Sequence, residues 1–159
     1  MIRPATAADH DAIWAILEPV IRAGETLATP RDMSRDEALA LWFSPDRTLR
    51  VLEEDGAVLG LYYVRANQTG GGAHVANAGY VTAQGATGRG VARRMCAASL
   101  DLARELGFAA MQFNFVISTN ERAVALWQGM GFAIVGRLPG AFAHPRGDRV
   151  DALVMFQQL

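Results

Sequence analysis

Within residues 91–116 the hydrophobic pattern changes from the period of a helix to the period of a strand. One face of the expected helix carries residues spaced by three or four: Val91, Met95, Ala98, Leu102 and Leu106. After Gly107, which suits a helix end, the expected strand has two alternating faces: Met111, Phe113 and Phe115 on one, Gln112 and Asn114 on the other. Another strand-like run, residues 75–82, precedes the helix. This strand–helix–strand unit predicts a sheet with helices packed on its faces.

Weaker patterns place the remaining elements around this unit. Further helices are expected to begin after Thr6, with a kink at Pro19, after Ser34 and after Asn120. The expected strands are residues 2–4, 48–53, 57–64, 75–82, 109–116, 132–135 and 152–156. We predict one domain, residues 1–159, with an α/β (α+β) fold. Its mixed central sheet has six to seven strands, with helices on both faces.

Composition and charge exclude several classes of protein. Hydrophobic residues make up 51% of the chain, which argues against disorder. The net charge of −1 gives no electrostatic footprint for nucleic acid or for an anionic membrane. No apolar run reaches the roughly 18 residues of a membrane span, and residues 1–4 do not begin a secretion signal. Because Cys96 is the only cysteine, no disulfide can form within the chain, and we expect a cytoplasmic protein. From the charge and the apolar runs we expect neither nucleic acid nor a membrane as a partner.

A glycine-rich loop, residues 85–92, joins the strand 75–82 to the following helix. Glycines let a backbone approach an anion closely, and a helix N-terminus supplies free N–H groups and a positive dipole. Arg89, Arg93 and Arg94 add charged donors. Such glycines often only turn the chain, so the loop by itself leaves both interpretations open. It matches neither G-x-G-x-x-G nor Gly-Lys-Ser/Thr, which excludes dinucleotide-binding and P-loop proteins.

Three segments together resemble the GNAT family of acetyltransferases. Residues 88–92 resemble the pyrophosphate loop of that family, residues 120–132 its second motif, and residues 147–155 its closing strand. The resemblance implies acetyl-CoA as co-substrate, transfer of the acetyl group to an amine, and no metal. It also implies a sheet that is splayed between the fourth and fifth strands, residues 75–82 and 109–116.

The resemblance implies two sets of cofactor-binding residues. The CoA pyrophosphate would lie on the backbone of a loop and helix start: Thr87, Gly88, Arg89, Gly90, Val91, Ala92 and Arg93. The pantetheine arm and thioester would lie against a second set: Tyr80, Val81, Thr82, Asn120 and Trp127.

Two positions depart from the pattern of the family. Thr87 stands where arginine or glutamine is usual, so one side-chain contact to phosphate is missing. Trp127 stands where a tyrosine often protonates the leaving thiolate. Because an indole N–H donates a hydrogen bond but releases no proton at neutral pH, the general acid is left to solvent or to Tyr80.

Two asparagines are expected to face the acceptor. Asn77 interrupts an apolar run, and Asn114 lies on the adjacent strand. An unpaired buried amide costs about 1–3 kcal/mol, so each needs a partner, either neighbouring backbone or a substrate carboxylate. Neither amide can act as a base. Asn77 and the run 113–120 also resemble a narrower group, the azetidine-2-carboxylate acetyltransferases, in which matching asparagines hold substrate and CoA.

Other candidates for the acceptor side are Glu25, in the loop 23–30, and Trp42. Glu25 or His74 could deprotonate an amine, although polar loop residues are usually just exposed. We interpret Cys96 as a core residue rather than a nucleophile, because no base is near it in the sequence.

The leading prediction is direct attack by the amine of a small molecule, such as an amino or imino acid, with strand N–H groups near Val81 stabilising the oxyanion. Acetylation of a protein is one alternative; it needs an open groove, which Trp42, Phe43 and Phe142 would instead close. A non-catalytic acyl-CoA-binding module is another. A homodimer is expected from the family alone.

Overall fold

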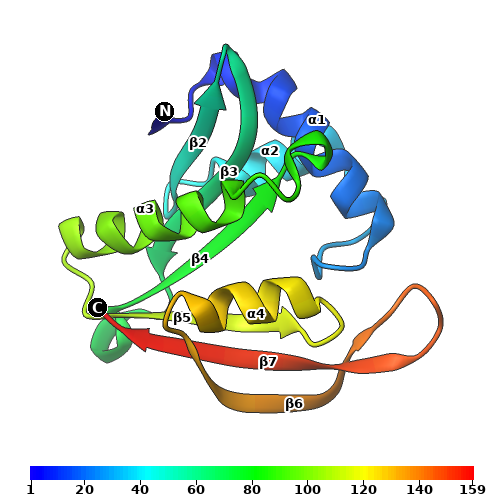
Figure 1. The fold of residues 1–159 in the computed structure, drawn as a ribbon, viewed down its shortest axis with the longest axis vertical. Coiled ribbons are helices and arrows are strands. Elements are labelled where there is room, and N and C mark those ends of the chain that lie inside the picture. The colour runs from blue at the N-terminus through cyan, green and yellow to red at the C-terminus, as the bar shows by residue number, and fades with distance from the viewer.

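One sheet of seven strands runs through the protein, as shown in Figure 1. The computed structural model describes every residue from Met1 to Leu159. The strands are β1 (Ile2–Pro4), β2 (Thr48–Glu54), β3 (Ala57–Ala66), β4 (Val75–Thr82), β5 (Ala110–Ile117), β6 (Ala133–Ala143) and β7 (Arg149–Gln158). Their order across the sheet is β1-β2-β3-β4-β5-β7-β6. Only β4 and β5 run parallel, so the predicted mixed sheet is confirmed.

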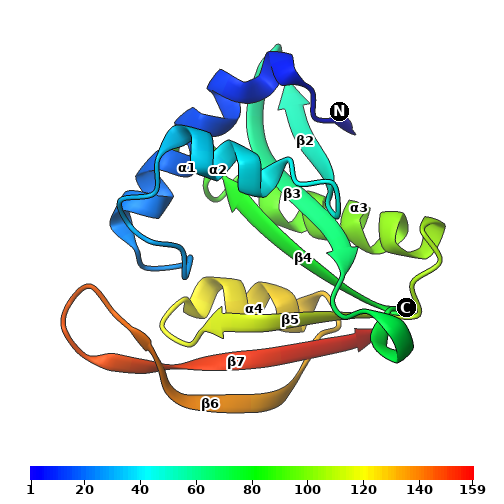
Figure 2. The same ribbon diagram turned by 180° about the vertical axis from the view of Figure 1, so that it is seen from behind.

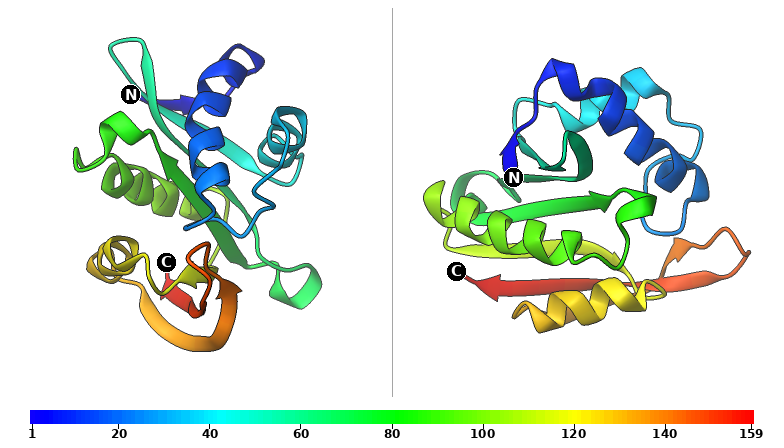
Figure 3. Two further views of the ribbon diagram at one scale, coloured as in Figure 1. Left: turned by 90° about the vertical axis from the view of Figure 1, so that its right-hand side faces the viewer. Right: turned by 45° about the horizontal axis from the view of Figure 1, so that its top comes forward.

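Helices cover both faces of this sheet, as predicted. The α-helices are α1 (His10–Ala23), α2 (Arg35–Trp42), α3 (Val91–Glu105) and α4 (Glu121–Gly129). Three short 3₁₀ turns accompany them: Ala7–Asp9, Gly70–Gly72 and Gln84–Ala86. Figure 3 shows α1 and α2 on one side of the sheet and α3 and α4 on the other. Pro19 lies inside α1, which nevertheless continues to Ala23. No helix is long and apolar enough to cross a membrane.

The apolar face predicted for the third helix is the one that α3 packs on the sheet. Val91, Met95 and Leu102 are buried in the larger of two cores, which also contains Tyr62, Met111 and other side chains from β3, β4 and β5. The prediction fails at Leu106, which follows the last residue of α3 and is 48% exposed. The smaller main core lies on the opposite face, between α1, α2 and the first strands.

Strand β5 does not keep the regular alternation that the sequence predicts. Its pairing with β7 shifts register between Phe113 and Val116. Phe113 and Val116 are buried in the larger core, whereas Phe115 is 36% exposed. An irregularity of this kind changes which residues face inward, so the expectation that Phe115 shares a face with Phe113 is wrong.

The last two strands are much longer than the predicted segments 132–135 and 152–156. β6 contains Pro139 and Gly140, which look like loop residues in a sequence. Its pairing with β7 shifts register twice, and the second shift, between Leu138 and Phe142, spans these two residues. Because β6 is the edge strand of the sheet, a proline can lie in it without removing an interior hydrogen bond.

The sheet opens between β4 and β5, as predicted. The two parallel strands pair only at Val75↔Ala110 and Ala76↔Met111, and then they diverge, as Figure 2 shows. β4 keeps an unbroken register with β3 along its whole length. The irregular strand at the splay is therefore β5, and β4 has no bulge against β3.

A buried ion pair fixes the start of the chain. Asp9 is 6% exposed and accepts two hydrogen bonds from Arg3, at 2.9 and 2.7 Å. It also accepts one from the backbone N–H of Thr6, at 2.8 Å, as expected of the predicted capping box. The Arg3 guanidinium holds the pKa of Asp9 at about 2 and also binds Glu53 on β2.

Candidate active site

A cavity of about 760 Å³ lies at the splay and is lined by residues from both faces of the sheet. It contains nearly all the residues predicted for cofactor binding, from the glycine-rich loop, the start of α3, the end of β4 and α4. The members that line it are Tyr80, Val81, Thr82, Thr87, Gly88, Gly90, Val91, Ala92, Arg93, Asn120 and Trp127. On the side of α1 it is lined by residues that include Leu27, Tyr63, Arg65 and Asn77. Of the predicted cofactor set, Arg89 alone does not line it.

The glycine-rich loop has the geometry of an anion site. Gly88 and Gly90 have positive φ, +82° and +75°, and a Cβ added to either would meet no atom within 4 Å. The N–H groups of Gly88, Gly90 and residues 91–93 donate to no backbone carbonyl. Five free donors within six residues at a helix N-terminus attract an anion. The side chain of Thr87 is exposed and adds no positive charge.

The arginines of this region are not equivalent. Arg94 and Arg89 both pair with Glu54, at the end of β2, and their cationic groups lower the pKa of that carboxyl. Arg93 makes no ion pair; its guanidinium reaches the sulfur of Met130 at 3.4 Å and lines the cavity. Arg93 therefore carries the uncompensated positive charge nearest to the free N–H groups.

The backbone of β4 presents alternate N–H groups to the splay. Bonds from Asn67 N–H to Val75 O and from Ala83 N–H to Leu59 O fix the register with β3. In an antiparallel pair, every second residue bonds to the partner strand, so the Val81 N–H faces β3. The N–H groups of Tyr80 and Thr82 face the splay instead. A strand N–H near Val81 that donates to an oxyanion in the splay, as predicted, would therefore belong to Tyr80 or Thr82.

An aromatic cluster forms one wall of the cavity. Trp127 on α4 is 8% exposed and packs against Tyr80 and Phe113, with ring centroids 4.9 and 5.1 Å away. Its indole N–H makes no hydrogen bond to the protein and is not fully buried. Asn120, at the start of α4, accepts a bond from the Ala123 N–H and caps the helix. Its side chain also borders the cavity.

The hydroxyl of Tyr80 points into the core beneath α3. It shares a hydrogen bond of 2.6 Å with Ser99, whose hydroxyl in turn donates to the backbone carbonyl of Cys96. Burial raises the pKa of Tyr80 well above 10, and burial also raises the pKa of the Cys96 thiol to about 11. A phenol held in this way does not favour the general-acid role predicted for Tyr80, and Cys96 has the surroundings of a core residue.

Asn77 lies at the point where β4 and β5 part. Its Nδ2 donates to the backbone carbonyl of Gln112 on β5, at 3.0 Å, one residue beyond the last strand pair. Its Oδ1 accepts from the Tyr63 hydroxyl and from Arg65 Nε, at 3.3 and 3.4 Å. The amide is 6% exposed. It therefore ties the two strands together through neighbouring protein groups, as one of the two alternatives predicted, and it also borders the cavity.

Asn114 also borders the cavity, and its amide is held by neighbours. Its Nδ2 donates to Asn67 Oδ1 at 2.6 Å, and its Oδ1 accepts from Gln112 at 3.0 Å. Asn77 and Asn114 are thus brought to the same cavity, but neither has a free amide oxygen. Each retains only one N–H for a ligand.

Trp42 does not line the cavity. It is 4% exposed, in the core under α2, and packs edge-to-face on Tyr63 at 5.3 Å. The sequence does not show whether Trp42 faces the core or the acceptor, because α2 has only eight residues and Trp42 is the last of them. His74 is exposed at the start of β4 and borders neither pocket.

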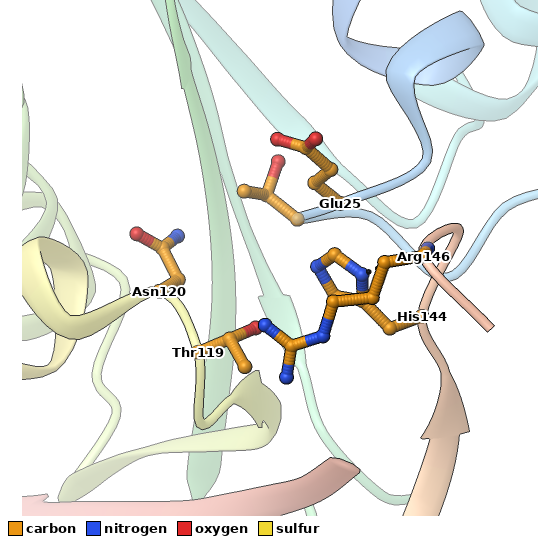
Figure 4. Close-up of a pocket in the computed structure, with 6 residues that line it drawn as sticks. Glu25, Thr119, Asn120, His144 and Arg146 are labelled. Carbon is orange, nitrogen blue, oxygen red and sulfur yellow. Dashed lines mark hydrogen bonds between the residues drawn. The ribbon is translucent and has the colours of Figure 1, made fainter. Parts of the chain in front are cut away.

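A second pocket of about 290 Å³ adjoins the first, and Figure 4 shows its lining. The residues are Glu25, Thr26, Thr119, Asn120, His144 and Arg146. Thr26 and Asn120 line both pockets. The turn between β6 and β7 supplies His144 and Arg146, which sequence reasoning missed because these residues looked like an ordinary turn.

Glu25 and His144 differ in what they offer to a ligand. The His144 Nδ1 accepts a bond from the Arg146 backbone N–H at 3.2 Å, and Nε2 points into the pocket (Figure 4). A neutral imidazole bonded in this way carries its proton on Nε2 and acts as a donor. Arg146 is neutralised by two hydrogen bonds to Asp148. Glu25 makes no ion pair or hydrogen bond and is the acidic side chain of this pocket.

No group of three or more His, Cys, Asp or Glu side chains is placed to hold a metal ion. A splayed sheet, a loop with free N–H groups at a helix start and a cavity lined from both faces of the sheet are the features of this fold that a family assignment has to explain. Residues 12–132 match the sequence profile of the acetyltransferase (GNAT) family. The chain belongs to this family and is an acetyl-CoA-dependent N-acetyltransferase.

Individual relatives agree with this assignment. N-acetyltransferase aca1 of Schizosaccharomyces pombe is 26% identical over 137 residues, which cover 76% of this chain and 66% of that protein. The chain thus spans just under two thirds of that relative. A GCN5-related N-acetyltransferase from Kribbella flavida is 40% identical, with a TM-score of 0.94 over 100% of this chain and 97% of that one.

A ribosomal-protein-alanine N-acetyltransferase from Brucella melitensis is 25% identical, with a TM-score of 0.85 over 100% of this chain and 99% of that one. Solved structures that share the fold at 23% and 21% identity contain acetyl-CoA.

Proposed function

We propose that the protein transfers the acetyl group of acetyl-CoA to the amine of a small amino or imino acid. One observation carries this proposal: the cavity that contains the glycine-rich loop adjoins a small polar pocket, which is lined by Glu25 and His144. That pocket lies between the loop after α1 and the β6–β7 turn, which can be followed in Figure 4. A pocket of about 290 Å³ without a hydrophobic lining residue suits a small polar acceptor.

The residues present fit acetyl-CoA. The free N–H groups of Gly88, Gly90 and residues 91–93 would hold the pyrophosphate, with Arg93 as the charged partner. A Cβ at Gly90 would fill the space that the anion needs. The Tyr80 and Thr82 backbone would accompany the pantetheine arm. When bound, acetyl-CoA supplies an acetyl group that is activated as a thioester.

The residues of the chain then position the acceptor and stabilise charge. The neutral amine adds to the carbonyl carbon, and the N–H of Tyr80 or Thr82 donates to the developing oxyanion. Trp127 excludes water from the thioester side. Glu25, directly or through water, accepts the proton of the amine. A CoA thiolate is a tolerable leaving group, so solvent protonation suffices where the family often has tyrosine.

Acetylation of a protein is a second candidate, favoured by the similarity to the ribosomal-protein-alanine enzyme. The small volume of the second pocket, about 290 Å³, suits a small acceptor better than a long peptide. The narrower resemblance to azetidine-2-carboxylate acetyltransferases supports an imino acid, through Asn77 and Asn114. A non-catalytic module predicts that acetyl-CoA is bound but never cleaved.

A panel of amines with acetyl-CoA, followed by release of free thiol, separates these functions. We expect thiol release with one or more amino or imino acids. A wild-type protein that acetylates a peptide N-terminus but no small amine would contradict the proposal. Binding of acetyl-CoA without thiol release from any amine or peptide would support the non-catalytic module.

We also propose a homodimer, because the edge strand β6 exposes Ile134, Val135 and Leu138 by 40%, 59% and 40%. An apolar edge strand of this length is usually covered. Light scattering of the purified protein tests this. A cytoplasmic location is likewise a proposal, on the ground of the lone buried Cys96.

A further inference from the structure

We infer that Arg65 binds the carboxylate of the acceptor. By this contact the site would select acceptors that carry a carboxylate over acceptors that lack one. The inference rests on the proposed function, a small-molecule acceptor that enters from the α1 side of the splay. Neither the pattern of the sequence nor the family motifs pointed to Arg65.

Arg65 lies beside the amide that closes the splay. On β3 it is the register partner of Asn77. Its Nε donates to Asn77 Oδ1 at 3.4 Å, and its side chain, 31% exposed, lines the cavity. The same Asn77 oxygen accepts from Tyr63. Arg65 therefore reaches the acceptor side from the strand next to β4, at the level where β4 and β5 diverge.

The charges around Arg65 leave an excess of positive charge. Its one ionic partner is Asp46, at 3.3 Å, and that carboxylate is 57% exposed and also accepts from the Ser44 hydroxyl. A second guanidinium, Arg47, lies 4.1 Å from the ring centroid of Tyr63 and has no ion pair. Its buried Nε has no hydrogen-bond partner, and burial lowers its pKa. Two guanidiniums thus lie in this region, and the one carboxylate beside them, that of Asp46, pairs with Arg65 alone.

The asparagines cannot supply what Arg65 supplies. Asn77 and Asn114 each use one amide N–H and their amide oxygen on neighbouring residues. A guanidinium has five N–H donors in a planar fork, and Arg65 uses two of them, one at Nε and one at Nη1. Hydrogen bonds between ions are about twice as strong as neutral ones. An incoming carboxylate therefore finds its strongest partner in Arg65, with the amides as secondary donors.

The pocket that adjoins the cavity contains an unpaired negative charge. Glu25 borders the second pocket without an ionic partner, whereas Arg65 borders the main cavity. An acceptor with both an amine and a carboxylate matches this separation of charge. A polyamine would place a cation beside Arg65, which costs binding free energy. The substrate class is therefore an amino or imino acid rather than a polyamine or a plain amine.

The test compares Arg65→Gln and Arg65→Lys on two matched acceptors at saturating acetyl-CoA: an amino acid from the panel and its uncharged carboxamide. For the acid, we expect Arg65→Gln to lower kcat/KM roughly 10- to 150-fold, mainly through KM, because a charged hydrogen bond is lost. For the carboxamide, kcat/KM should change less than about threefold. Arg65→Lys should give an intermediate loss for the acid, because it keeps the charge but not the fork.

Arg35→Gln is the matched control. It also removes one guanidinium, but Arg35 pairs with the 95% exposed Asp11 on α1 and borders neither pocket. Its kinetics should equal those of the wild type. Calorimetric titration of the acid into each variant, without acetyl-CoA, gives a second readout, in which Arg65→Gln alone should weaken binding of the acid.

Equal losses for acid and carboxamide in both Arg65 variants would overturn the inference and leave Arg65 with a structural role through Asn77. If Arg65→Gln fails to fold, the Lys variant and the wild-type preference for acid over carboxamide decide the question. A wild type that prefers the carboxamide overturns the anion site but leaves small-molecule acetylation intact. A wild type that acetylates no small amine contradicts the proposed function as well.

Discussion

Trp127 occupies a position at which the family often has a tyrosine, and it keeps the aromatic ring without the acidic hydroxyl. Its ring fills the wall between Tyr80 and Phe113, where an aromatic side chain is needed for packing. Its N–H can donate but cannot protonate a thiolate. The Tyr80 hydroxyl, turned toward Ser99 in the core, is not a ready substitute. The surroundings of Trp127 and Tyr80 therefore favour a reaction in which no side chain acts as the general acid.

Replacing Trp127 with Phe should keep most of the activity. The variant retains the aromatic wall and loses at most one hydrogen bond, worth about 1 kcal/mol, so kcat should fall by less than about tenfold. Steady-state kinetics at saturating acetyl-CoA measure this. A fall of about three orders of magnitude with unchanged acetyl-CoA binding would show that the indole takes part in the chemistry.

Asp9 should stabilise the fold in a pH-dependent way. Arg3 lowers the pKa of Asp9 from 3.8 to about 2 in the folded protein. A lowered folded pKa gives stability that is present above 3.8 and is lost as the pH falls through 2. Asp9→Asn should therefore cost about 1–3 kcal/mol of unfolding free energy at pH 7, and the difference from the wild type should shrink below pH 4.

Denaturant unfolding from pH 7 down to the lowest pH at which the protein folds measures this difference. Asp11→Asn is the control, since the Asp11 carboxylate is 95% exposed and a surface ion pair contributes little. A constant difference between Asp9→Asn and the wild type at every pH would contradict the assignment.

At the scale of elements, the glycine-rich loop and the start of α3 work as one unit. The loop can leave five N–H groups free because Gly88 and Gly90 adopt positive φ and so turn the chain into the helix. Glycine accepts this backbone conformation without strain. The same two glycines that lead the chain into α3 thus leave free the N–H groups that we propose to hold the pyrophosphate.

Gly90→Val should abolish acetyl-CoA binding while the fold is retained. Gly107, at φ +86°, offers a matched control, since a Cβ at either glycine meets no atom within 4 Å. Both valine variants should lose about 1–3 kcal/mol of stability through backbone strain. Only Gly90→Val should lose the rise in melting temperature on addition of acetyl-CoA. Normal stabilisation of Gly90→Val by acetyl-CoA would show that the loop does not hold the cofactor.

At the scale of the whole molecule, the sheet consists of two parts joined by a narrow hinge of contacts. The strand pairing between β1–β4 and β5–β7 consists of two residue pairs, and side-chain bonds from Asn77 to Gln112 and from Asn114 to Asn67 add to it. The cavity occupies the space that strand pairing would otherwise fill. A ligand in the splay replaces those missing contacts and should link the two parts.

Amide exchange, followed by NMR with and without acetyl-CoA, should reveal this link. The N–H groups of Tyr80 and Thr82 face the splay, so their exchange should slow by one to two orders of magnitude at about 100 times Kd. Gly79 and Val81, whose N–H groups bond to β3, should exchange slowly in both states. Equal slowing at all four residues would contradict a ligand lying along β4.

The sequence by itself determined the order of the elements, because that order depends on local periodicity. Its resemblance to the GNAT family predicted the splay, which is confirmed, and it predicted a set of cofactor residues that the fold brings to one cavity, with the exception of Arg89. It placed the asparagines at the cavity but not their partners, because Arg65, Gln112 and Asn67 come from other segments.

Only the tertiary structure decided the acceptor side. The register shift in β5 turned Phe115 outward, and the packing of α2 placed Trp42 in the core rather than at the site. The β6–β7 turn brought His144 next to the loop of Glu25, across more than a hundred residues of sequence. Charged residues that meet across such long separations follow no spacing pattern that can be recognised in the sequence. For that reason the excess positive charge beside Asn77 became visible only when β2, β3 and β4 were assembled.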